Sequence, residues 1–205
     1  MAIISNAVTM ADAGAFSVSL GSQVFIKTLT ASSSSDLTFV HGASSVVLDT
    51  TYPLYLFKFI NLHFSDNACN FQVNFRDGGS SYDASKTSSF MYSSHTEDGN
   101  TVVGPRKDDS RAEDASTAVQ ALGQNIGNGN DECLSGHMYL FNPGSTTFQK
   151  QFMATLNYYQ EADKTENIHV VGYCDVAAAI DGVQFNSSAG TIDSGSIKLY
   201  GIKDS

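Results

Sequence analysis

The stretch Asn70–Arg76 reads Asn-Phe-Gln-Val-Asn-Phe-Arg and alternates polar and apolar residues with a period of two. Successive side chains of a β-strand point to opposite faces of its sheet, so this period places Phe71, Val73 and Phe75 together on one face. The polar residues then lie on the other face. The pattern predicts a half-buried β-strand.

The same period recurs along the chain, which predicts an all-β protein. Phe148–Tyr159 is the longest example, with Phe152, Ala154, Leu156 and Tyr158 on the inward side. Tyr55–Phe64 is apolar on both faces at its start, which favours a central strand or one covered by another subunit. The remaining predicted strands are Val24–Leu29, Leu37–Val40, His137–Phe141, Ile168–Cys174, Val183–Phe185 and Ser194–Ile202.

Turn residues separate these strands and indicate how they connect. Gly, Pro, Asn and Asp gather between the runs, where tight turns need them. We expect Tyr55–Phe64 and Asn70–Arg76 to form one hairpin, and His137–Phe141 and Phe148–Tyr159 to form another. Antiparallel hairpins of this kind predict a β-sandwich, and we expect residues 1–205 to form a single domain.

A long polar excursion covers residues 93–131 and divides the chain into two halves. Within it, Arg111–Leu122 has helical spacing of its apolar residues, with Ser110 as a candidate N-cap. We therefore expect a long loop that carries one short helix. Loops of this length in a compact domain usually make functional contacts.

Charge restricts the kind of partner. Only 16% of the residues are charged, and 11 Lys and Arg against 21 Asp and Glu give a formal net charge of −10. Nucleic-acid affinity comes largely from cationic side chains that displace counterions, so we expect no nucleic-acid partner. No apolar run reaches the roughly 20 residues of a membrane span, and Met1–Ser22 lacks the pattern of a signal peptide, so we expect no membrane partner.

Metal-binding and catalytic patterns are missing from the sequence. Cys69, Cys133 and Cys174 are widely spaced and odd in number, which favours free thiols over a zinc site or disulfides. Gly123–Glu132 contains many oxygen ligands but lacks the spacing of a calcium loop. We therefore expect no metal and no cofactor.

No nucleophile stands in a recognisable turn, because the chain contains no G-x-S-x-G. Asp77-Gly78-Gly79 is typical of a turn and lacks the spacing of a phosphate-binding loop. The histidines occur singly, which favours structural roles, and they are His41, His63, His95, His137 and His169. We expect no catalytic residue and predict that the protein is not an enzyme.

Several segments carry a family resemblance. Ser194–Ile202 resembles the concluding "sGtIkLYGI" strand of small virion proteins of tailed bacteriophages, especially those of marine bacteria and cyanobacteria. Tyr52–Tyr82 resembles that family's "Y..Y.f.i.nl....d.a.l...f..dGG..Y", and Gly136–Lys150 resembles its "G.i.l.nP.s....k". Ala177–Ile202 extends the match at the C-terminal end. Residues 1–50 and 93–132 differ from the family or are not diagnostic.

The resemblance implies a non-enzymatic shell or tail component with a jelly-roll-like sandwich, assembled in the host cytoplasm and located in the virion. We interpret the chain as a capsid decoration or cement protein, which docks on the head surface in many copies. A tail-fibre or receptor-binding component is the alternative within that class. A carbohydrate-binding module is the alternative outside it, although the absence of Trp counts against an aromatic sugar platform.

The expected partners are further copies of the chain, most simply in a trimer, together with the major capsid protein or tail subunits. Tyr52, Tyr55, Phe57 and Phe59 form an aromatic row that a single sandwich would leave partly uncovered. We expect these four side chains to make the subunit contact, since cyclic association would bury them.

Overall fold

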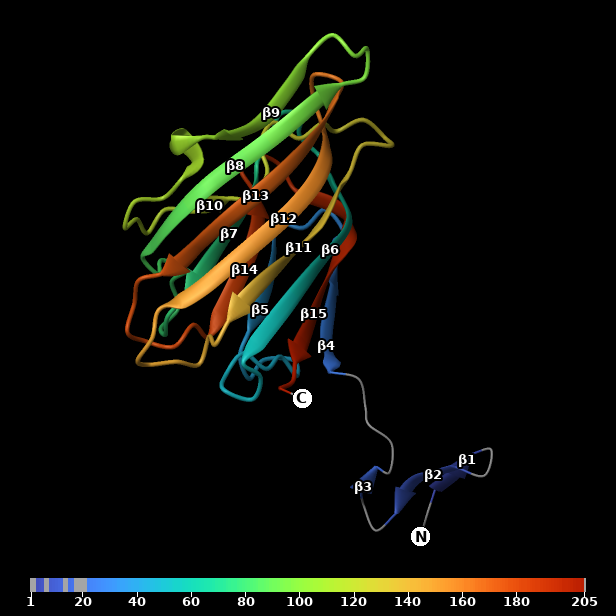
Figure 1. The fold of residues 1–205 in the computed structure, drawn as a ribbon, viewed down its shortest axis with the longest axis vertical. Coiled ribbons are helices and arrows are strands. Elements are labelled where there is room, and N and C mark those ends of the chain that lie inside the picture. Colours follow the sequence, from blue (N-terminus) through green and yellow to red (C-terminus); the bar gives the residue numbers. More distant parts are fainter. Residues whose placement is uncertain (1–2, 6–7, 13–14, 17–21, 205) are drawn as a thin grey trace.

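The structure is a computed structural model that describes residues 3–5, 8–12, 15–16 and 22–204. It is all-β, with 55% strand and 2% helix, and its two main antiparallel sheets pack against each other (Figure 1). The predicted β-sandwich is confirmed.

The larger sheet has eight strands in the order β4-β15-β6-β11-β12-β13-β8-β9. Their bounds, in chain order, are β4 Gln23–Thr30, β6 Leu54–Phe64, β8 Lys86–Thr96, β9 Val102–Lys107, β11 Leu134–Phe141, β12 Lys150–Gln160, β13 Lys164–Cys174 and β15 Ile192–Ile202. Every pair of neighbouring strands is antiparallel.

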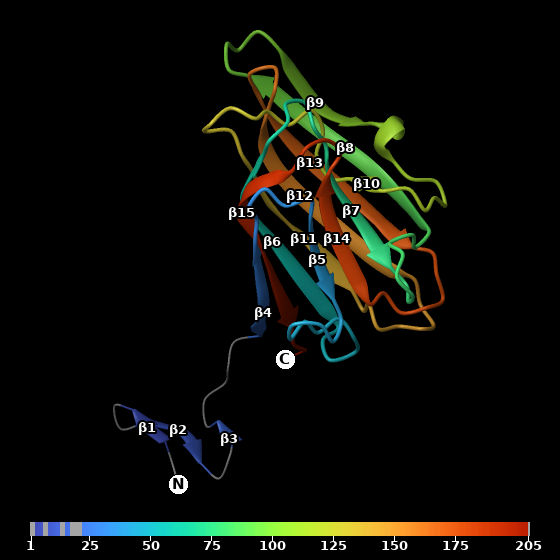
Figure 2. The ribbon, with the colours of Figure 1, turned by 180° about the vertical axis from the view of Figure 1, so that it is seen from behind.

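The smaller sheet has four strands in the order β10-β7-β14-β5. Their bounds are β5 Asp36–Val40, β7 Phe71–Arg76, β10 Gln120–Ala121 and β14 Gly182–Ser187. The chain passes repeatedly between the two sheets, since β5, β7, β10 and β14 each lie in sequence between strands of the larger sheet. Figure 2 shows the smaller sheet covering one face of the larger one.

Three short strands near the N-terminus form a separate antiparallel sheet and pair with neither sheet of the sandwich: β1 Ile3–Ser5, β2 Val8–Asp12 and β3 Ala15–Phe16. The helix η1, Asp109–Arg111, is a single 3-10 turn. In the part of the chain that the structure describes, no helix is long and apolar enough to cross a membrane.

Aromatic side chains from both sheets meet in the core. Phe71, Val73 and Phe75 are fully buried, as the alternation in β7 predicts. The rings of Phe59 and Phe71 pack edge to face with centroids 5.1 Å apart, and Phe185 of β14 stacks on Phe71 at 5.8 Å. Because β6 and β7 lie in different sheets, this contact joins the two layers.

The C-terminal strand β15 is paired on both sides, with β4 along one edge and β6 along the other. Its side chains alternate as expected, because Ile197 and Leu199 are fully buried while Lys198 and Tyr200 are half-exposed. The last predicted strand is therefore an interior strand of the larger sheet.

The predicted hairpin of Tyr55–Phe64 and Asn70–Arg76 is wrong. β6 pairs with β11 and β15, whereas β7 pairs with β10 and β14 in the opposite sheet. Alternation shows which face of a strand is buried but not which strand lies beside it, and these two strands pack face to face. The second predicted hairpin is confirmed, since β11 and β12 pair directly.

The helix predicted over Arg111–Leu122 is also wrong, because helical structure ends at Arg111. The backbone of Ser116 exchanges two 2.9 Å hydrogen bonds with Lys86 of β8, and Leu122 N donates to Phe71 O at 2.7 Å. Ala115 has a φ of +49°, which breaks any helix. The backbone thus pairs with β8 and β7, and the start of the excursion forms the unpredicted strands β8 and β9.

Candidate interaction surface

Three of the four predicted contact residues are inside the protomer. Tyr55, Phe57 and Phe59 are 0%, 0% and 2% exposed. They lie on the inward face of β6, where the smaller sheet of the same chain covers them. The prediction that these side chains face a neighbouring subunit is therefore wrong for all three.

Tyr52, the fourth predicted contact residue, precedes β6 and does not belong to its inward face. Its half-buried ring packs edge to face on Tyr55, with centroids 5.6 Å apart. It also lies against the backbone of Gly201, where a β-carbon would overlap the ring. Tyr52 thus covers the end of β15 within its own chain, and no continuous exposed aromatic row links it to the others.

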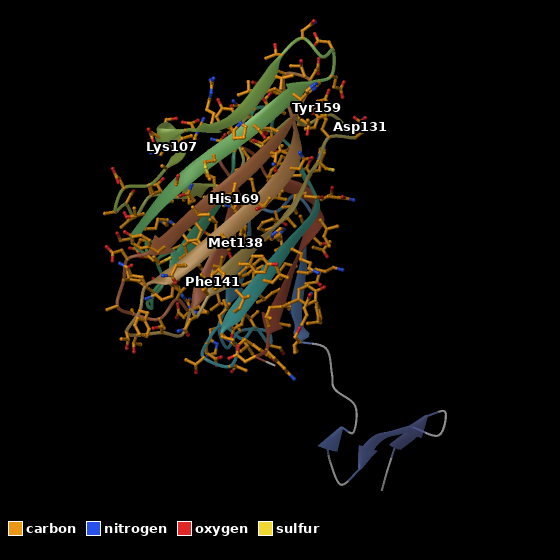
Figure 3. The ribbon with its side chains drawn as sticks, in the orientation of Figure 1. Lys107, Asp131, Met138, Phe141, Tyr159 and His169 are labelled. Carbon is orange, nitrogen blue, oxygen red and sulfur yellow. The ribbon has the colours of Figure 1, made fainter. Side chains whose placement is uncertain are left out.

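The outward face of the larger sheet, with eight strands, is the broader outward surface of the sandwich (Figure 3). One register line crosses six neighbouring strands of this sheet and carries almost only apolar side chains. We call it the apolar row, and its members are Phe25, Tyr200, Leu56, Tyr139, Met153 and Val171. Phe25 is 57% exposed and Met153 is 43% exposed.

The adjacent register line carries cationic and titratable side chains. Lys198 lies opposite Lys58, Lys58 lies opposite His137, and Thr155 joins His137 to His169. We call Lys198, Lys58, His137 and His169 the cationic row. All four side chains are half-exposed.

Neighbouring side chains contact two members of the cationic row, Lys58 and His169. The Lys58 ammonium stands over the Tyr200 ring, 4.9 Å from its centroid. The Nδ1 atom of His169 is 3.1 Å from Thr155 Oγ1. Partial burial, followed by the positive charges of Lys58 and His169, lowers the pKa of His137. The lowered pKa favours the neutral form of His137 at pH 7, and Lys58 and Lys198 supply permanent positive charge to the row.

Acidic residues avoid this face. The strands β4, β6, β8, β9, β11 and β12 contain no Asp or Glu. Glu166 of β13 points inward and is 1% exposed. Asp193, at the start of β15, lies 3.8 Å from His63. A chain with a net charge of −10 thus presents one broad face with positive charge at its centre.

An open apolar depression lies at the β12–β13 end of the apolar row and has a volume of about 530 Å³. Its lining includes Phe141, Met153, Val171 and Tyr173 from β11, β12 and β13. Phe141 marks the lower end of this face in Figure 3, with His169 near its middle. Such a depression suits an apolar side chain of a docking protein better than a polar substrate.

The scattered histidines have separate local partners. His41 Nδ1 accepts a hydrogen bond from Leu48 N at 3.1 Å, and His63 Nε2 lies 3.1 Å from Gly129 O. Among the described residues, no group of three or more His, Cys, Asp or Glu side chains is placed to hold a metal ion. The oxygen-rich segment Gly123–Glu132 is tied internally, because Gly129 N donates to Glu132 Oε2 at 2.7 Å.

Sequence reasoning missed the two outward rows. Lys58 and Lys198 are far apart in the chain, and only the antiparallel register places them side by side. The absence of acidic residues from the strand segments was nevertheless visible in the sequence, and it was the signal that marked this face.

Comparison of the chain with protein-family models, with curated proteins and with solved structures finds no match.

Proposed function

We propose that this protein is a non-enzymatic structural subunit of a tailed-phage virion, and that it acts as a capsid decoration protein. One observation carries the proposal: the outward face of the larger sheet is broad and partly apolar, and Asp193 at the start of β15 is the one half-exposed acidic side chain on its described strands. Such a face suits a lasting contact with another protein surface better than catalysis.

The size of the face suits a stable protein contact. Eight strands spaced 4.7–4.9 Å apart make a sheet roughly 35 Å wide, and strands of 11 residues are about as long. A face of that size can supply the roughly 800 Å² per partner that a specific interface buries. The exposed rings and methionine in the apolar row are residue types enriched in such interfaces.

The resemblance of Tyr52–Tyr82, Gly136–Lys150 and Ala177–Ile202 to tailed-phage virion proteins supports the same proposal, since that resemblance implies a sandwich. A decoration subunit binds in many copies, so individually modest contacts accumulate through multivalency. Acidic loops around the docking face would keep the free subunit soluble before assembly.

The carbohydrate-binding alternative rests on the half-exposed aromatic rings of the same face, Tyr139, Phe141, Tyr173 and Tyr200. A tail-fibre role would use the same rings on a host glycan. Two neighbouring aromatic pairs on this face are edge to face or tilted, at 5.7 and 6.4 Å, and do not form a flat platform. Decoration is therefore the function we favour.

Electron microscopy of particles purified from cells that express the gene tests this proposal. We expect density for many copies on the head, at positions related by the capsid symmetry. Density at the tail alone would support the fibre alternative. Absence from the particle, together with binding to a glycan array, would support the carbohydrate alternative and overturn the proposal.

A further inference from the structure

A group of the chain's acidic residues gathers at one end of the sandwich, while others, among them Asp83, Asp109, Asp114 and Asp175, are exposed elsewhere. Six carboxylates that are exposed lie in the turns there, and we call them the acidic tip: Asp66, Glu97, Asp98, Asp131, Glu161 and Asp163. Hydrogen bonds hold these turns together, since Asn67 Nδ2 donates to Glu161 at 3.4 Å and Glu97 N donates to Asp163 O at 3.0 Å. Asp131 and Tyr159 mark this end at the top of Figure 3.

The cationic row holds positive charge that the chain does not neutralise. Lys58 and Lys198 are directly opposite each other in register, and like charges in that position destabilise a sheet. Of the residues that the structure describes, no Asp or Glu forms an ion pair with either lysine. The Lys58 ammonium instead makes a cation–π contact with the Tyr200 ring.

The acidic tip and the cationic row carry charges of opposite sign and lie on different parts of one molecule. We propose that the cationic row on the sheet face of one subunit receives the acidic tip of a second copy of this chain. The inference rests on the proposed function, because it names the partner of the docking face, a second copy of the chain, and the two surfaces that meet. Carboxylates placed beside Lys58 and Lys198 would relieve the repulsion between them.

The same charges disfavour contacts between like surfaces. Two sheet faces in direct contact would bring four lysines together, and two tips in contact would bring twelve carboxylates together, as the residues of each copy show. The proposed contact therefore joins unlike surfaces, and when the tip of each subunit lies on the face of the next the contact is heterologous. Such contacts close into a ring when the rotation between neighbours permits it. In this proposal the tip-on-face contact between subunits takes the place of the aromatic subunit contact that the sequence predicted.

Sedimentation velocity of the purified full-length chain tests the inference with charge-reversed surfaces. The face variant is Lys58→Glu with Lys198→Glu, and the tip variant combines Glu97→Lys, Asp131→Lys, Glu161→Lys and Asp163→Lys, which leaves four lysines against two carboxylates. The matched control for the face variant is Arg106→Glu with Lys203→Glu, which makes the same charge change at exposed residues outside both surfaces. Circular dichroism establishes that each variant remains folded.

We expect the wild-type protein and the control to sediment as oligomers at low salt. They should dissociate as salt rises from about 0.05 M to about 0.5 M, where the screening length falls from roughly 14 Å to roughly 4 Å. The face variant alone and the tip variant alone should remain monomers. An equimolar mixture of the two should associate again, because each supplies the reversed partner of the other.

A wild-type protein that stays monomeric at all salt concentrations would overturn the inference, as would a mixture that does not associate. These failures are distinguishable from failure of the proposed function. If the wild type is monomeric but its binding to particles requires Lys58 and Lys198, the face docks an acidic capsid surface and only the second-copy inference fails. If the chain assembles as expected but is absent from particles, only the virion role fails.

Discussion

The phenol of Tyr158 exchanges two hydrogen bonds of 2.9 Å with the backbone of Gln124, donating to its carbonyl oxygen and accepting from its N–H. Tyr158 belongs to β12, whereas Gln124 lies within the long excursion, just after β10. Both residues are buried. This exchange attaches the excursion to the larger sheet, and the Gln124 side chain extends the attachment by donating to Glu166 at 2.9 Å.

Replacing Tyr158 by Phe should destabilise the protein by about 1–3 kcal/mol, because the substitution leaves buried backbone groups of Gln124 without a partner. Urea unfolding measures the change. Tyr159→Phe is the matched control, since the Tyr159 hydroxyl donates only to Asp163 at the surface, and its unfolding midpoint should not change. A Tyr158→Phe protein as stable as the wild type would show that the loop is held by other contacts.

An ion pair makes stability depend on pH. Both carboxylate oxygens of Asp181 accept hydrogen bonds from Arg76, at 2.8 and 2.9 Å, and Gly78 N donates at 3.3 Å. Burial by itself would raise the pKa of Asp181, but the Arg76 and Gly78 hydrogen bonds outweigh it and lower that pKa below its usual value. The stabilisation is therefore complete above the unfolded pKa, about 3.9, and is lost as the pH falls through the lower folded pKa.

Asp181→Asn should thus lower the free energy of unfolding at pH 7 by about 1–2 kcal/mol, since charge-assisted hydrogen bonds are strong but this pair is partly open to solvent. The wild-type and variant curves should converge below the folded pKa of Asp181. Asp114→Asn changes an exposed carboxylate and serves as the control. Curves that stay parallel into acid would mean that the charge of Asp181 does not contribute.

The three cysteines are free thiols in different environments. Cys174 is fully buried between Lys86 and Lys150, which flank it in register on β8 and β12. Burial raises the pKa of Cys174 to about 12, although the two lysines act in the opposite direction. Each lysine ammonium is held by loop carbonyl oxygens, including that of Ala118 at 2.5 Å for Lys86 and that of Ala178 at 2.7 Å for Lys150.

We expect one thiol, Cys133, to react quickly with Ellman's reagent in the native protein at neutral pH. Cys69 and Cys174 should react only as the protein unfolds, because the thiolate is the reactive form and both sites disfavour it. Cys133→Ser should remove the fast phase. Unreduced, denatured protein should titrate three thiols, and a count of one would reveal a disulfide.

The sequence predicted which faces of the strands are buried, and the reason is local. In β7 and β12 the period of two places Phe71, Phe75 and Phe152 inward whatever the neighbouring strand is. The pairing of β6 depends instead on β11 and β15, whose residues are distant in sequence. That is why the hairpin prediction failed, and why the contact residues of β6 were placed outside although the opposite sheet covers them.

The candidate surface was beyond prediction for the same physical reason. Lys58 alone is a polar residue within an apolar strand, and Lys198 alone is a polar residue near the C-terminus. Their significance comes from register, which places them together, and from the lack of acidic residues on the strands around them. The strand β8, which was not predicted, is polar at most outward positions. Its inward positions include the buried Lys86 as well as the apolar Phe90, so the sequence shows no clear alternation of apolar and polar residues.

Truncation tests the importance of the C-terminal strand. A chain ending at Ser194 lacks Ile197 and Leu199 and leaves β4 and β6 without the strand between them. We expect this chain to be insoluble or unfolded, and the single substitution Ile197→Ala to cost about 2–5 kcal/mol. A chain ending at Lys203 should melt as the wild type does. A soluble Ser194 truncation with an unchanged melting temperature would contradict the pairing of β15.

The contact of Gly201 with Tyr52 gives a final test of how β15 is covered. A β-carbon at Gly201 would overlap the Tyr52 ring, so Gly201→Ala should displace the ring and destabilise the protein by about 1–3 kcal/mol. Tyr52→Ala should itself be destabilising, but adding Gly201→Ala to it should cost little more. Chemical denaturation of the two single variants and the double variant gives a coupling free energy, which we expect to exceed about 1 kcal/mol.

Gly104→Ala is the matched control, because a β-carbon there meets no atom within 4 Å, and its stability should equal that of the wild type. Additive effects of Gly201→Ala and Tyr52→Ala would show that the ring does not rest on Gly201. The coupling free energy compares the cost of Gly201→Ala when the Tyr52 ring is present with its cost when the ring is absent. It therefore isolates this contact from the general loss of an aromatic side chain. The coupling thus tests directly whether Tyr52 packs on β15 of its own chain, as in the structure, and so is not a residue of the proposed contact on the outward face of the larger sheet.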